Sequence, residues 1–219
     1  MCGRYTLTVD EEAVMRRFHL DSSEAGHTPR FNIAPTQMAP VVLNEAPRRL
    51  SVGRWGLIPA WSKDATIGAR LINARAETLI EKPAFRTPLK RRRCLVPADG
   101  FYEWRAEGKS KTPFFIRLKS GEPFALAGLW EVWQPPTGEP LRTFTIITVE
   151  ANECIAPFHA RMPAILPREV EQAWVDPETP AVELMAVLAP FPAREMEVWA
   201  VSRRVNSPAN DDASLIEAI

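Results

Sequence analysis

Short hydrophobic runs recur along the chain, and polar residues or prolines separate them. Most runs are four to seven residues long and consist mainly of β-branched or aromatic residues, a pattern typical of β-strands. Helical periodicity, with hydrophobic residues three or four positions apart, is less frequent. The runs predict strands over residues 40–43, 50–55, 93–96, 101–104, 114–118, 124–130, 143–149 and 196–201.

Three segments carry helical signals. Thr8 and Glu11 form a capping-box pattern ahead of an amphipathic stretch, which predicts a first helix near the N-terminus. Pro167 is placed to start a second helix. A third helix is expected after Pro180, over residues 182–188.

The order of these elements indicates the fold class. The chain holds 21 prolines in 219 residues, close to twice the usual frequency of about 5%, and they lie between the hydrophobic runs. Strands in succession with a few helices predict an α+β fold, with a mainly antiparallel, curled or barrel-like sheet and flanking helices. Because no internal repeat or low-complexity linker interrupts the pattern, we expect a single domain over residues 1–219.

Charge is balanced overall but unevenly distributed. Lys plus Arg and Asp plus Glu each number 27, which argues against a generally cationic nucleic-acid binder. Residues 48–119 nevertheless hold seventeen basic and six acidic residues, whereas residues 150–219 hold five basic and twelve acidic ones. A basic middle segment suits a polyanion. Pairing with the acidic C-terminal third explains the same distribution, so charge alone leaves both interpretations open.

Cysteine usage and the N-terminal pattern bear on the cellular compartment. The chain has three cysteines, Cys2, Cys94 and Cys154, at wide spacings and without a CxxC pair, so neither a disulfide framework nor a zinc site is expected. We expect no metal and no cofactor. The sequence shows no signal-peptide pattern and no apolar run of about eighteen residues. These features predict a cytoplasmic protein in a reducing compartment, without contact with a membrane.

Cys2 is the most informative single residue. A small side chain after Met1 is the usual condition for removal of the initiator methionine, which would leave a cysteine with a free α-amine. The amine, with a pKa of about 7.7–8.0, and the thiol, with a pKa of about 8.5, can attack one aldehyde in turn and form a thiazolidine. A small residue tolerated at a frayed chain end is the alternative explanation of Cys2.

Other polar residues follow or interrupt the predicted strands. His159 lies in a loop directly after a predicted strand, a common place for catalytic residues. Strand alternation would place Asn73 and Arg75 on one face. Glu103 stands between two aromatic residues, so it is either solvent-facing, paired with a cation, or buried with a raised pKa that suits proton transfer.

Together these segments resemble the SOS-response-associated peptidase (SRAP) family, whose members shield abasic sites in DNA by crosslinking to them. The resemblance runs through almost the whole chain, in one order. Its matching pieces are residues 1–5 (MCGRY), 31–36 (FNIAPT), 55–59 (WGLIP), 72–78 (INARAET), 93–104 (RCLVPADGFYEW), the strand end at Thr148, 159–163 (HARMP) and 205–212 (VNSPANDD).

The resemblance implies a catalytic set. In the family, the N-terminal cysteine forms a thiazolidine with the ring-opened sugar of an abasic site, and Cys2 keeps that position. Asn73 would orient the cysteine backbone and the sugar, Glu103 would act as acid or base near the α-amine, and His159 would act at the sugar hydroxyl. This sequence departs from the family at Ala160, which follows His159 where an acidic or polar residue often stands.

The resemblance also implies a positively charged channel for single-stranded DNA containing abasic sites, including DNA at replication forks. Phosphate contacts of this kind are independent of sequence, which suits a lesion without a base. We therefore expect a monomer associated with the nucleoid. The implied DNA contacts are Arg4, Arg75 and Arg161 at phosphates, Pro35 and Trp61 as apolar or stacking side chains at the break in base stacking, and Thr148.

Rival functions from other classes stay open at this stage. Cys2, His159 and Asn73 would also suit a cysteine peptidase triad, in which the thiol alone attacks an amide. The start of the chain further resembles amidotransferases that release ammonia from glutamine. A non-covalent single-strand binding module, in which Cys2 is incidental, is the third alternative.

Overall fold

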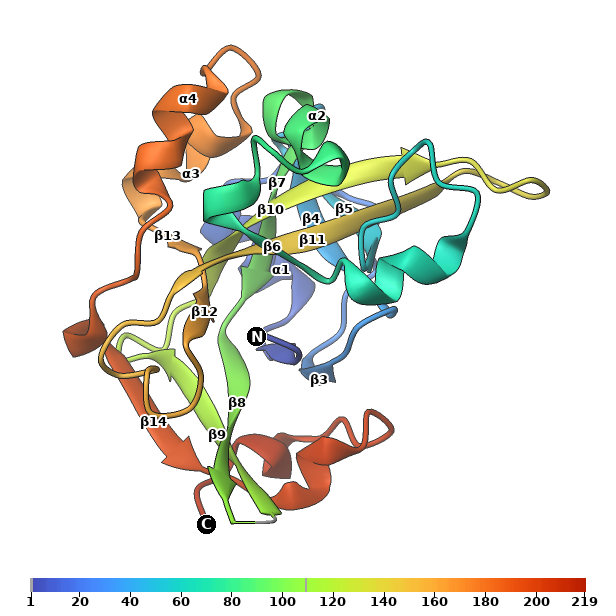
Figure 1. The fold of residues 1–219 in the computed structure, drawn as a ribbon. Coiled ribbons are helices and arrows are strands. Elements are labelled where there is room, and N and C mark those ends of the chain that lie inside the picture. The colour runs from blue at the N-terminus through green and yellow to red at the C-terminus, as the bar shows by residue number, and fades with distance from the viewer. Residues whose placement is uncertain (1, 109) are drawn as a thin grey trace.

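A computed structural model describes residues 2–108 and 110–219 of the chain (Figure 1). In those residues, strands dominate and helices are short. The strands are β1 (Tyr5–Leu7), β2 (Ser22–Ser23), β3 (Arg30–Ile33), β4 (Met38–Leu43), β5 (Arg49–Trp55), β6 (Asn73–Arg75), β7 (Arg93–Ala98), β8 (Gly100–Glu107), β9 (Ser110–Leu118), β10 (Phe124–Trp133), β11 (Leu141–Glu150), β12 (Arg161–Pro163), β13 (Ile165–Leu166) and β14 (Met196–Ala200).

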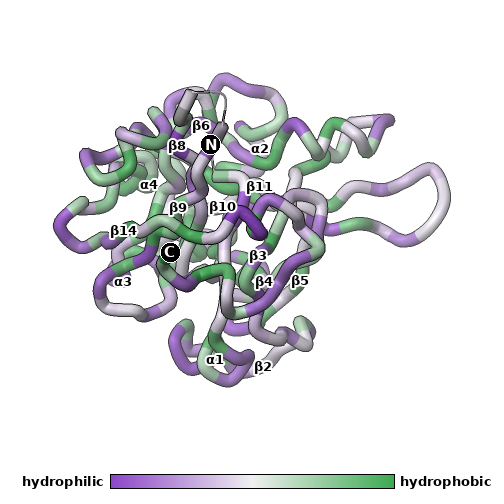
Figure 2. Tube along the Cα trace, turned by 90° about the horizontal axis from the view of Figure 1, so that it is seen from below, coloured by the Kyte–Doolittle hydropathy of each residue, from purple (hydrophilic) through white to green (hydrophobic). Residues whose placement is uncertain are grey.

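The helices lie on the outside of the sheets (Figure 1). In Figure 2, α1 shows both hydrophobic and hydrophilic segments, as expected for a helix that covers a core on one side only. The α-helices are α1 (Glu11–Phe18), α2 (Pro83–Arg91), α3 (Arg168–Val175) and α4 (Ala181–Leu184). The 3-10 helices are η1 (Ala65–Arg70), η2 (Ala76–Thr78), η3 (Met185–Val187), η4 (Ala193–Glu195), η5 (Arg203–Asn206) and η6 (Ala213–Ile216).

Five strands of the larger sheet close into a barrel. Over the described residues this sheet has nine strands, and its central order is β11, β10, β7, β4 and β5, each antiparallel to the next. β11 also pairs in parallel with β5, which joins the two ends. Closure leaves these five strands without an open edge. The predicted α+β class with a mainly antiparallel, barrel-like sheet is confirmed.

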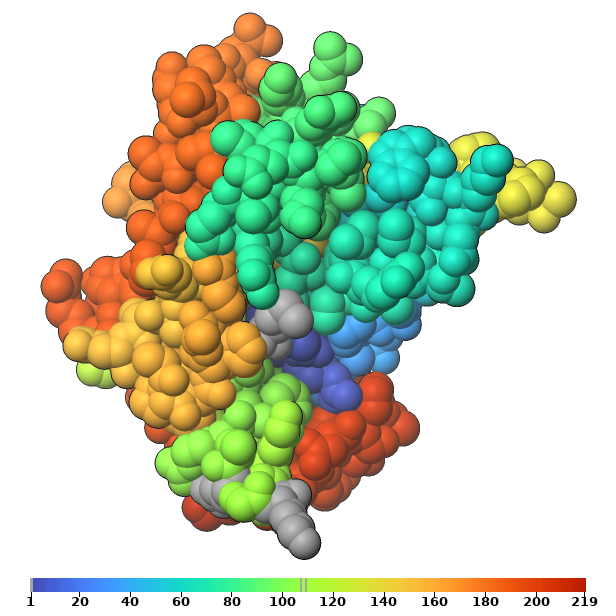
Figure 3. Space-filling view, in the orientation of Figure 1, coloured from blue at the N-terminus to red at the C-terminus, as the bar shows by residue number. Residues whose placement is uncertain are grey.

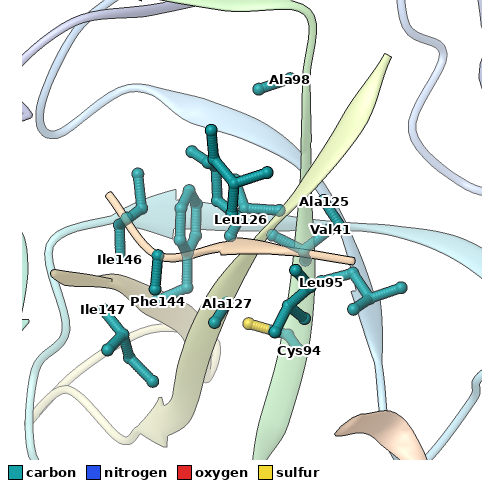
Figure 4. Packing of buried hydrophobic residues seen from close by; sticks show 14 of the residues in the cluster. Val41, Cys94, Leu95, Ala98, Ala125, Leu126, Ala127, Phe144, Ile146 and Ile147 are labelled. Atoms are coloured by element: carbon teal, nitrogen blue, oxygen red, sulfur yellow. The ribbon is translucent and has the colours of Figure 1, made fainter. Parts of the chain in front are cut away.

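The barrel interior forms the main hydrophobic core. Figure 4 shows Val41 of β4, Leu126 of β10 and Phe144 of β11 packed together there. All three are at most 1% exposed. The second sheet, in the order β14, β9, β8, β1 and β3 over the part of the chain that the structure describes, contributes Tyr5 and Phe101 to the same buried cluster. The N-terminal strand is thereby anchored to the core.

All eight predicted strands are confirmed, with bounds shifted by a few residues. The helix predicted at Pro167 is confirmed as α3, and the segment after Pro180 is helical as α4 and η3. The capping box at Thr8 is wrong: Asp10 is the N-cap of α1, and its Oδ1 accepts from the backbone N–H of Ala13. Thr8 instead donates from its backbone N–H and Oγ1 to Asp99 Oδ2.

Helix α2 was absent from the expected elements. Pro83 lies in its first turn, where a proline is favourable, but Pro88 lies inside it, and a proline there normally argues against a helix. Phe85 and Leu89, one helical turn apart, are nearly fully buried. Their burial against the sheet outweighs the weak propensity of the segment. No helix among the described residues has the length and hydrophobicity needed to cross a membrane.

Candidate functional site

The N-terminal strand is the centre of the site. β1 pairs with both β3 and β8, so it lies within the second sheet. On the face shown in Figure 3, the blue N-terminal residues lie where four other surfaces meet. These surfaces come from the teal segment around β6, the light-green β8–β9 hairpin, the yellow-orange loop before β12 and the red C-terminal segment.

Arg4 ties this strand to the C-terminal segment. Its Nη1 donates to Asn32 Oδ1 at 2.8 Å and to the carbonyl oxygen of Val205 at 2.6 Å. Its Nη2 donates to the carbonyl oxygen of Asn206 at 3.1 Å. Partial burial lowers the pKa of Arg4. The guanidinium therefore spends several of its donors on protein acceptors.

A second set of hydrogen bonds holds the C-terminal segment against β3. The side chain of Asn32 is fully buried, and its Nδ2 lies 2.8 Å from the carbonyl oxygen of Asn210 and 3.0 Å from that of Ser207. Asp211 Oδ1 accepts from the backbone N–H groups of Phe31 and Asn32. The motifs at residues 31–36 and 205–212 thus build the wall of the site.

Asn73 fixes the backbone of Cys2. Its Nδ2 donates to the carbonyl oxygen of Cys2 at 2.8 Å. Asn73 belongs to β6, which pairs in parallel with β11 of the barrel, and lies opposite Ile146 in that pairing. Asn73 Oδ1 is buried and has no hydrogen-bond partner among the described residues. This oxygen is available to a donor from outside the described residues.

The Cys2 side chain is fully buried in the chain that carries Met1. Its Sγ lies 3.9 Å from the carbonyl oxygen of Arg4. Burial raises the pKa of the Cys2 thiol, and the negative charge of Glu103 raises it further. The thiol is therefore held in its neutral form, and Glu103 is close enough to influence it.

Glu103 lies on β8 and is only 4% exposed. Burial raises the pKa of its carboxyl group. The interpretation of Glu103 as a solvent-facing residue is therefore wrong, because its side chain is buried. Gly100 at the start of β8 permits the close approach of Phe115, because a Cβ there would lie 2.2 Å from Cζ of Phe115.

His159 lies in the loop between β11 and β12, as expected. Its Nδ1 accepts a hydrogen bond of 2.9 Å from the backbone N–H of Arg161. In the neutral ring, the proton is therefore carried by Nε2. Partial burial lowers the pKa of His159, which favours this neutral form at physiological pH. The preceding residue, Phe158, stacks on Phe114 of β9 with ring centroids 4.7 Å apart.

A cleft of about 700 Å³ brings Glu103 and His159 together. Its lining includes Lys111 of β9, which sequence reasoning missed. The positive charge of Lys111 lowers the pKa of Glu103 and the pKa of His159. Burial is the larger influence on each: it raises the pKa of Glu103 and lowers the pKa of His159. The described lining residues of the cleft are Glu103, Trp104, Ala106, Lys111, Phe158, His159 and Asn206.

Three of the predicted DNA contacts are neighbours across β6, β11 and β12. Arg75 is exposed and lies opposite Thr148 in the strand pairing. Thr148 itself is 1% exposed, so its side chain presents no surface to a ligand in this conformation. Its carbonyl oxygen accepts from Nη2 of Arg161 at 2.6 Å. Thr148 thus supports Arg161.

The two predicted apolar contacts lie outside this cluster. Trp61 follows β5 and is 64% exposed, which is unusual for a large aromatic side chain. Pro35 follows β3 and is half-buried, next to Thr36, whose φ of 71° marks a tight turn. Neither is among the described residues that line the cleft. Among all the residues that the structure describes, no three or more His, Cys, Asp or Glu side chains form a group suited to a metal ion.

A mainly antiparallel barrel carries a site in which Asn73 holds the Cys2 backbone, Glu103 acts on the Cys2 thiol, and Glu103 shares a cleft with His159. The chain belongs to the family described as SOS response associated peptidase (SRAP), which matches residues 1–208. The resemblance inferred from the sequence motifs is confirmed.

The relatives of the chain include proteins named for DNA lesions. It is 47% identical to the abasic site processing protein YoqW of Bacillus subtilis (strain 168), with 100% of both chains covered. It is 35% identical to the abasic site processing protein HMCES of Gallus gallus, over 86% of this chain and 66% of that protein. A crystal structure of a protein from Bacteroides thetaiotaomicron matches with a TM-score of 0.91 at 29% identity, covering 100% of both chains.

Proposed function

We propose that the protein recognises abasic sites in single-stranded DNA and shields them by a covalent thiazolidine crosslink through Cys2. The names of its relatives support abasic-site processing. The observation that carries the covalent mechanism is the hydrogen bond from Asn73 to the Cys2 carbonyl. It supports a fixed position for the residue that becomes the N-terminus, close to Glu103.

The chemistry begins with removal of Met1, which converts the amide nitrogen of Cys2 into an amine. The amine adds to the aldehyde carbon of the ring-opened sugar to give a carbinolamine, which loses water to give an imine. The thiol sulfur then adds to the imine carbon, and its proton passes to the nitrogen. One water molecule leaves in the whole sequence, and the aldehyde is no longer available for strand cleavage.

The neighbouring residues suit the proton transfers that these steps need. An abasic sugar is mostly a closed hemiacetal, and ring opening requires a proton at the ring oxygen. We propose that the Nε2–H of His159 donates a hydrogen bond to the ring oxygen and that the protonated ring supplies the proton. Glu103, whose pKa is raised by burial, can take up and return protons at the amine and carbinolamine. Asn73 Oδ1 can accept a hydrogen bond from the new amine or the sugar hydroxyl.

DNA would be held by cations around this site. Arg75 is exposed, and among the described residues it has no ion-pair partner, so its charge is available to a phosphate. Arg161 and Arg4 are engaged in protein contacts, and we propose that each shares its guanidinium with a phosphate on binding. Trp61 would stack on a base beside the lesion, and Pro35 would support the kink.

The same proposal implies a DNA partner, an oligomeric state and a cellular location. The partner would be single-stranded DNA with abasic sites, including strands exposed at replication forks. We propose that the chain acts as a single domain and a monomer, in the cytoplasm at the nucleoid. Release of the crosslink would use the same groups in reverse.

A cysteine peptidase is less well supported. Such an enzyme needs its histidine bonded to the thiol. Over the described residues no hydrogen bond joins Cys2 and His159, and Asn73 binds the Cys2 backbone rather than the imidazole. The amidotransferase alternative has no feature of the site in its favour.

Incubation with single-stranded DNA that carries one abasic site tests the proposal. We expect an adduct that survives heat and SDS with the wild type, and no such adduct with Cys2→Ala. Cys94→Ala is the matched control, because Cys94 is buried in the core. An adduct that forms with undamaged DNA as well would contradict the proposal.

A further inference from the structure

Glu77 forms an ion pair with Arg161 beside the site, through two hydrogen bonds. Its Oε1 accepts from Nη1 of Arg161 at 2.6 Å, and its Oε2 accepts from Nη2 at 2.9 Å. The arginine side chain is 13% exposed and the glutamate side chain 51%. A carboxylate in this two-bonded arrangement occupies the edge of the guanidinium that a phosphate would otherwise take.

The pair also joins two elements that carry site residues. Glu77 lies in η2, directly after β6 with Asn73. Arg161 opens β12, and its backbone N–H is the donor that fixes the tautomer of His159. The ion pair therefore connects the strand that holds the Cys2 backbone with the loop that carries the imidazole.

The pair aligns two elements of the site, but the negative charge of Glu77 opposes the binding of DNA phosphates. The Glu77 carboxylate stays ionised, because its hydrogen bonds to Arg161 lower its pKa. It neutralises Arg161 and adds a negative charge next to Arg75, whose own charge acts on the Glu77 carboxyl group. Of the two arginines, only Arg75 offers an uncompensated charge to a phosphate.

We propose that Glu77 is a positioning residue that acts in two opposing directions. It holds Arg161, and through it the His159 loop, in the arrangement that the chemistry needs. It also weakens DNA binding, because it occupies the guanidinium of Arg161. This inference rests on the proposed DNA-crosslinking function.

The test compares wild type with Glu77→Gln, which keeps the shape of the side chain and removes its charge. Affinity is measured by fluorescence anisotropy on a single strand with a tetrahydrofuran abasic analogue, which has no aldehyde and cannot crosslink. We expect Glu77→Gln to bind about two- to fivefold more tightly at low salt. The slope of log affinity against log salt should become steeper by about 0.7, as expected for one further effective cation on a single strand.

Chemistry is measured as the single-turnover crosslinking rate at saturating DNA with a true abasic site. Here we expect Glu77→Gln to be about tenfold slower, because the imidazole is no longer held in place. In the Arg161→Ala background, Glu77→Gln should slow the reaction no further. A variant that is tighter in binding yet slower in reaction is a combination that simple loss of structure does not produce.

Glu24→Gln is the matched control. Glu24 also binds arginines, with Arg142 Nη1 at 2.8 Å from its Oε1 and Arg49 as a second partner. Arg142 lies six residues before Thr148 on β11, roughly 20 Å along the strand. We expect Glu24→Gln to change neither the salt slope nor the rate.

The outcomes separate this inference from the function on which it rests. Wild type that neither binds the analogue nor forms an adduct would overturn the proposed function. Wild type that does both, with a Glu77→Gln variant unchanged in salt slope, would overturn the inference alone. A tighter Glu77→Gln variant with the wild-type rate would overturn the positioning role.

Discussion

Asn73 donates a hydrogen bond to the backbone carbonyl oxygen of Cys2 at 2.8 Å, across 71 positions of the chain. Parallel pairing with β11 places Asn73 at the barrel wall. The second residue of the chain is therefore positioned by a strand that pairs with the barrel. A nucleophile at a frayed end would lack the fixed geometry that fast reaction with an aldehyde requires.

Replacing Asn73 tests this relationship. Asn73→Ala should slow crosslinking by at least about tenfold, because Cys2 loses its anchor. The free energy of unfolding should fall by only about 1 kcal/mol, the usual contribution of one hydrogen bond. Single-turnover rates and urea unfolding measure the two effects. Asn44→Ala is the control: its side chain also makes buried hydrogen bonds, to Arg91 and Trp130, and its loss should leave the rate unchanged.

Glu103 should make stability depend on pH. Its pKa is raised by burial, so the folded state binds a proton more tightly than the unfolded state, where Glu titrates near about 4.3. Its contribution to the free energy of unfolding is then greatest below that pH and is lost as pH rises through the folded-state pKa. Relative to wild type, Glu103→Gln should therefore gain stability from pH 4 to pH 8. Thermal unfolding across this range measures the difference, and a constant difference would contradict the raised pKa.

His159 should matter for ring opening. We expect His159→Gln to slow crosslinking to a closed abasic sugar by about 10²-fold, and to slow reaction with a substrate held as an open aldehyde much less. Because burial lowers the pKa of His159, its protonated form accumulates only below the ordinary value of about 6.5. The ratio of closed-sugar to open-aldehyde rates should rise as pH falls toward that range in wild type and stay flat in His159→Gln. Equal ratios in the two proteins would remove His159 from the mechanism.

Lys111 should tune both acid–base residues. Its positive charge lowers the pKa of Glu103 and of His159. Lys111→Gln should therefore shift the pH profile of the crosslinking rate toward higher pH. Lys119→Gln makes the same change in net charge just after the end of β9, where Lys119 acts on Cys154, and should leave the profile in place. Superimposable profiles for wild type and Lys111→Gln would show that the lysine lies too far from both groups in solution.

The sequence was sufficient for most strands but not for the contacts between distant segments. The run at residues 143–149 is rich in β-branched residues, and those at residues 93–96 and 124–130 are short and mainly hydrophobic; all three become barrel strands. Helix α2 was not predicted, because Pro88 inside it opposes a helix, and burial of Phe85 and Leu89 compensates for that proline.

The sequence likewise indicated some residues of the candidate site and not others. Cys2, Glu103 and His159 stood out because their residue types and local surroundings suggested reactivity. Lys111 did not, because a lysine in a hairpin resembles any solvated charge until the fold places it in the cleft. The Glu77–Arg161 pair spans 84 positions, so no local pattern indicated that the arginine is already paired.

Intact-protein mass spectrometry of the adduct with an abasic single strand is the most direct measurement of the central claim. The account predicts a mass equal to the protein without Met1 plus the DNA minus one water molecule, formed without borohydride and absent from Cys2→Ala. An adduct that retains Met1, or one that forms undiminished with Cys2→Ala, would contradict a thiazolidine at Cys2.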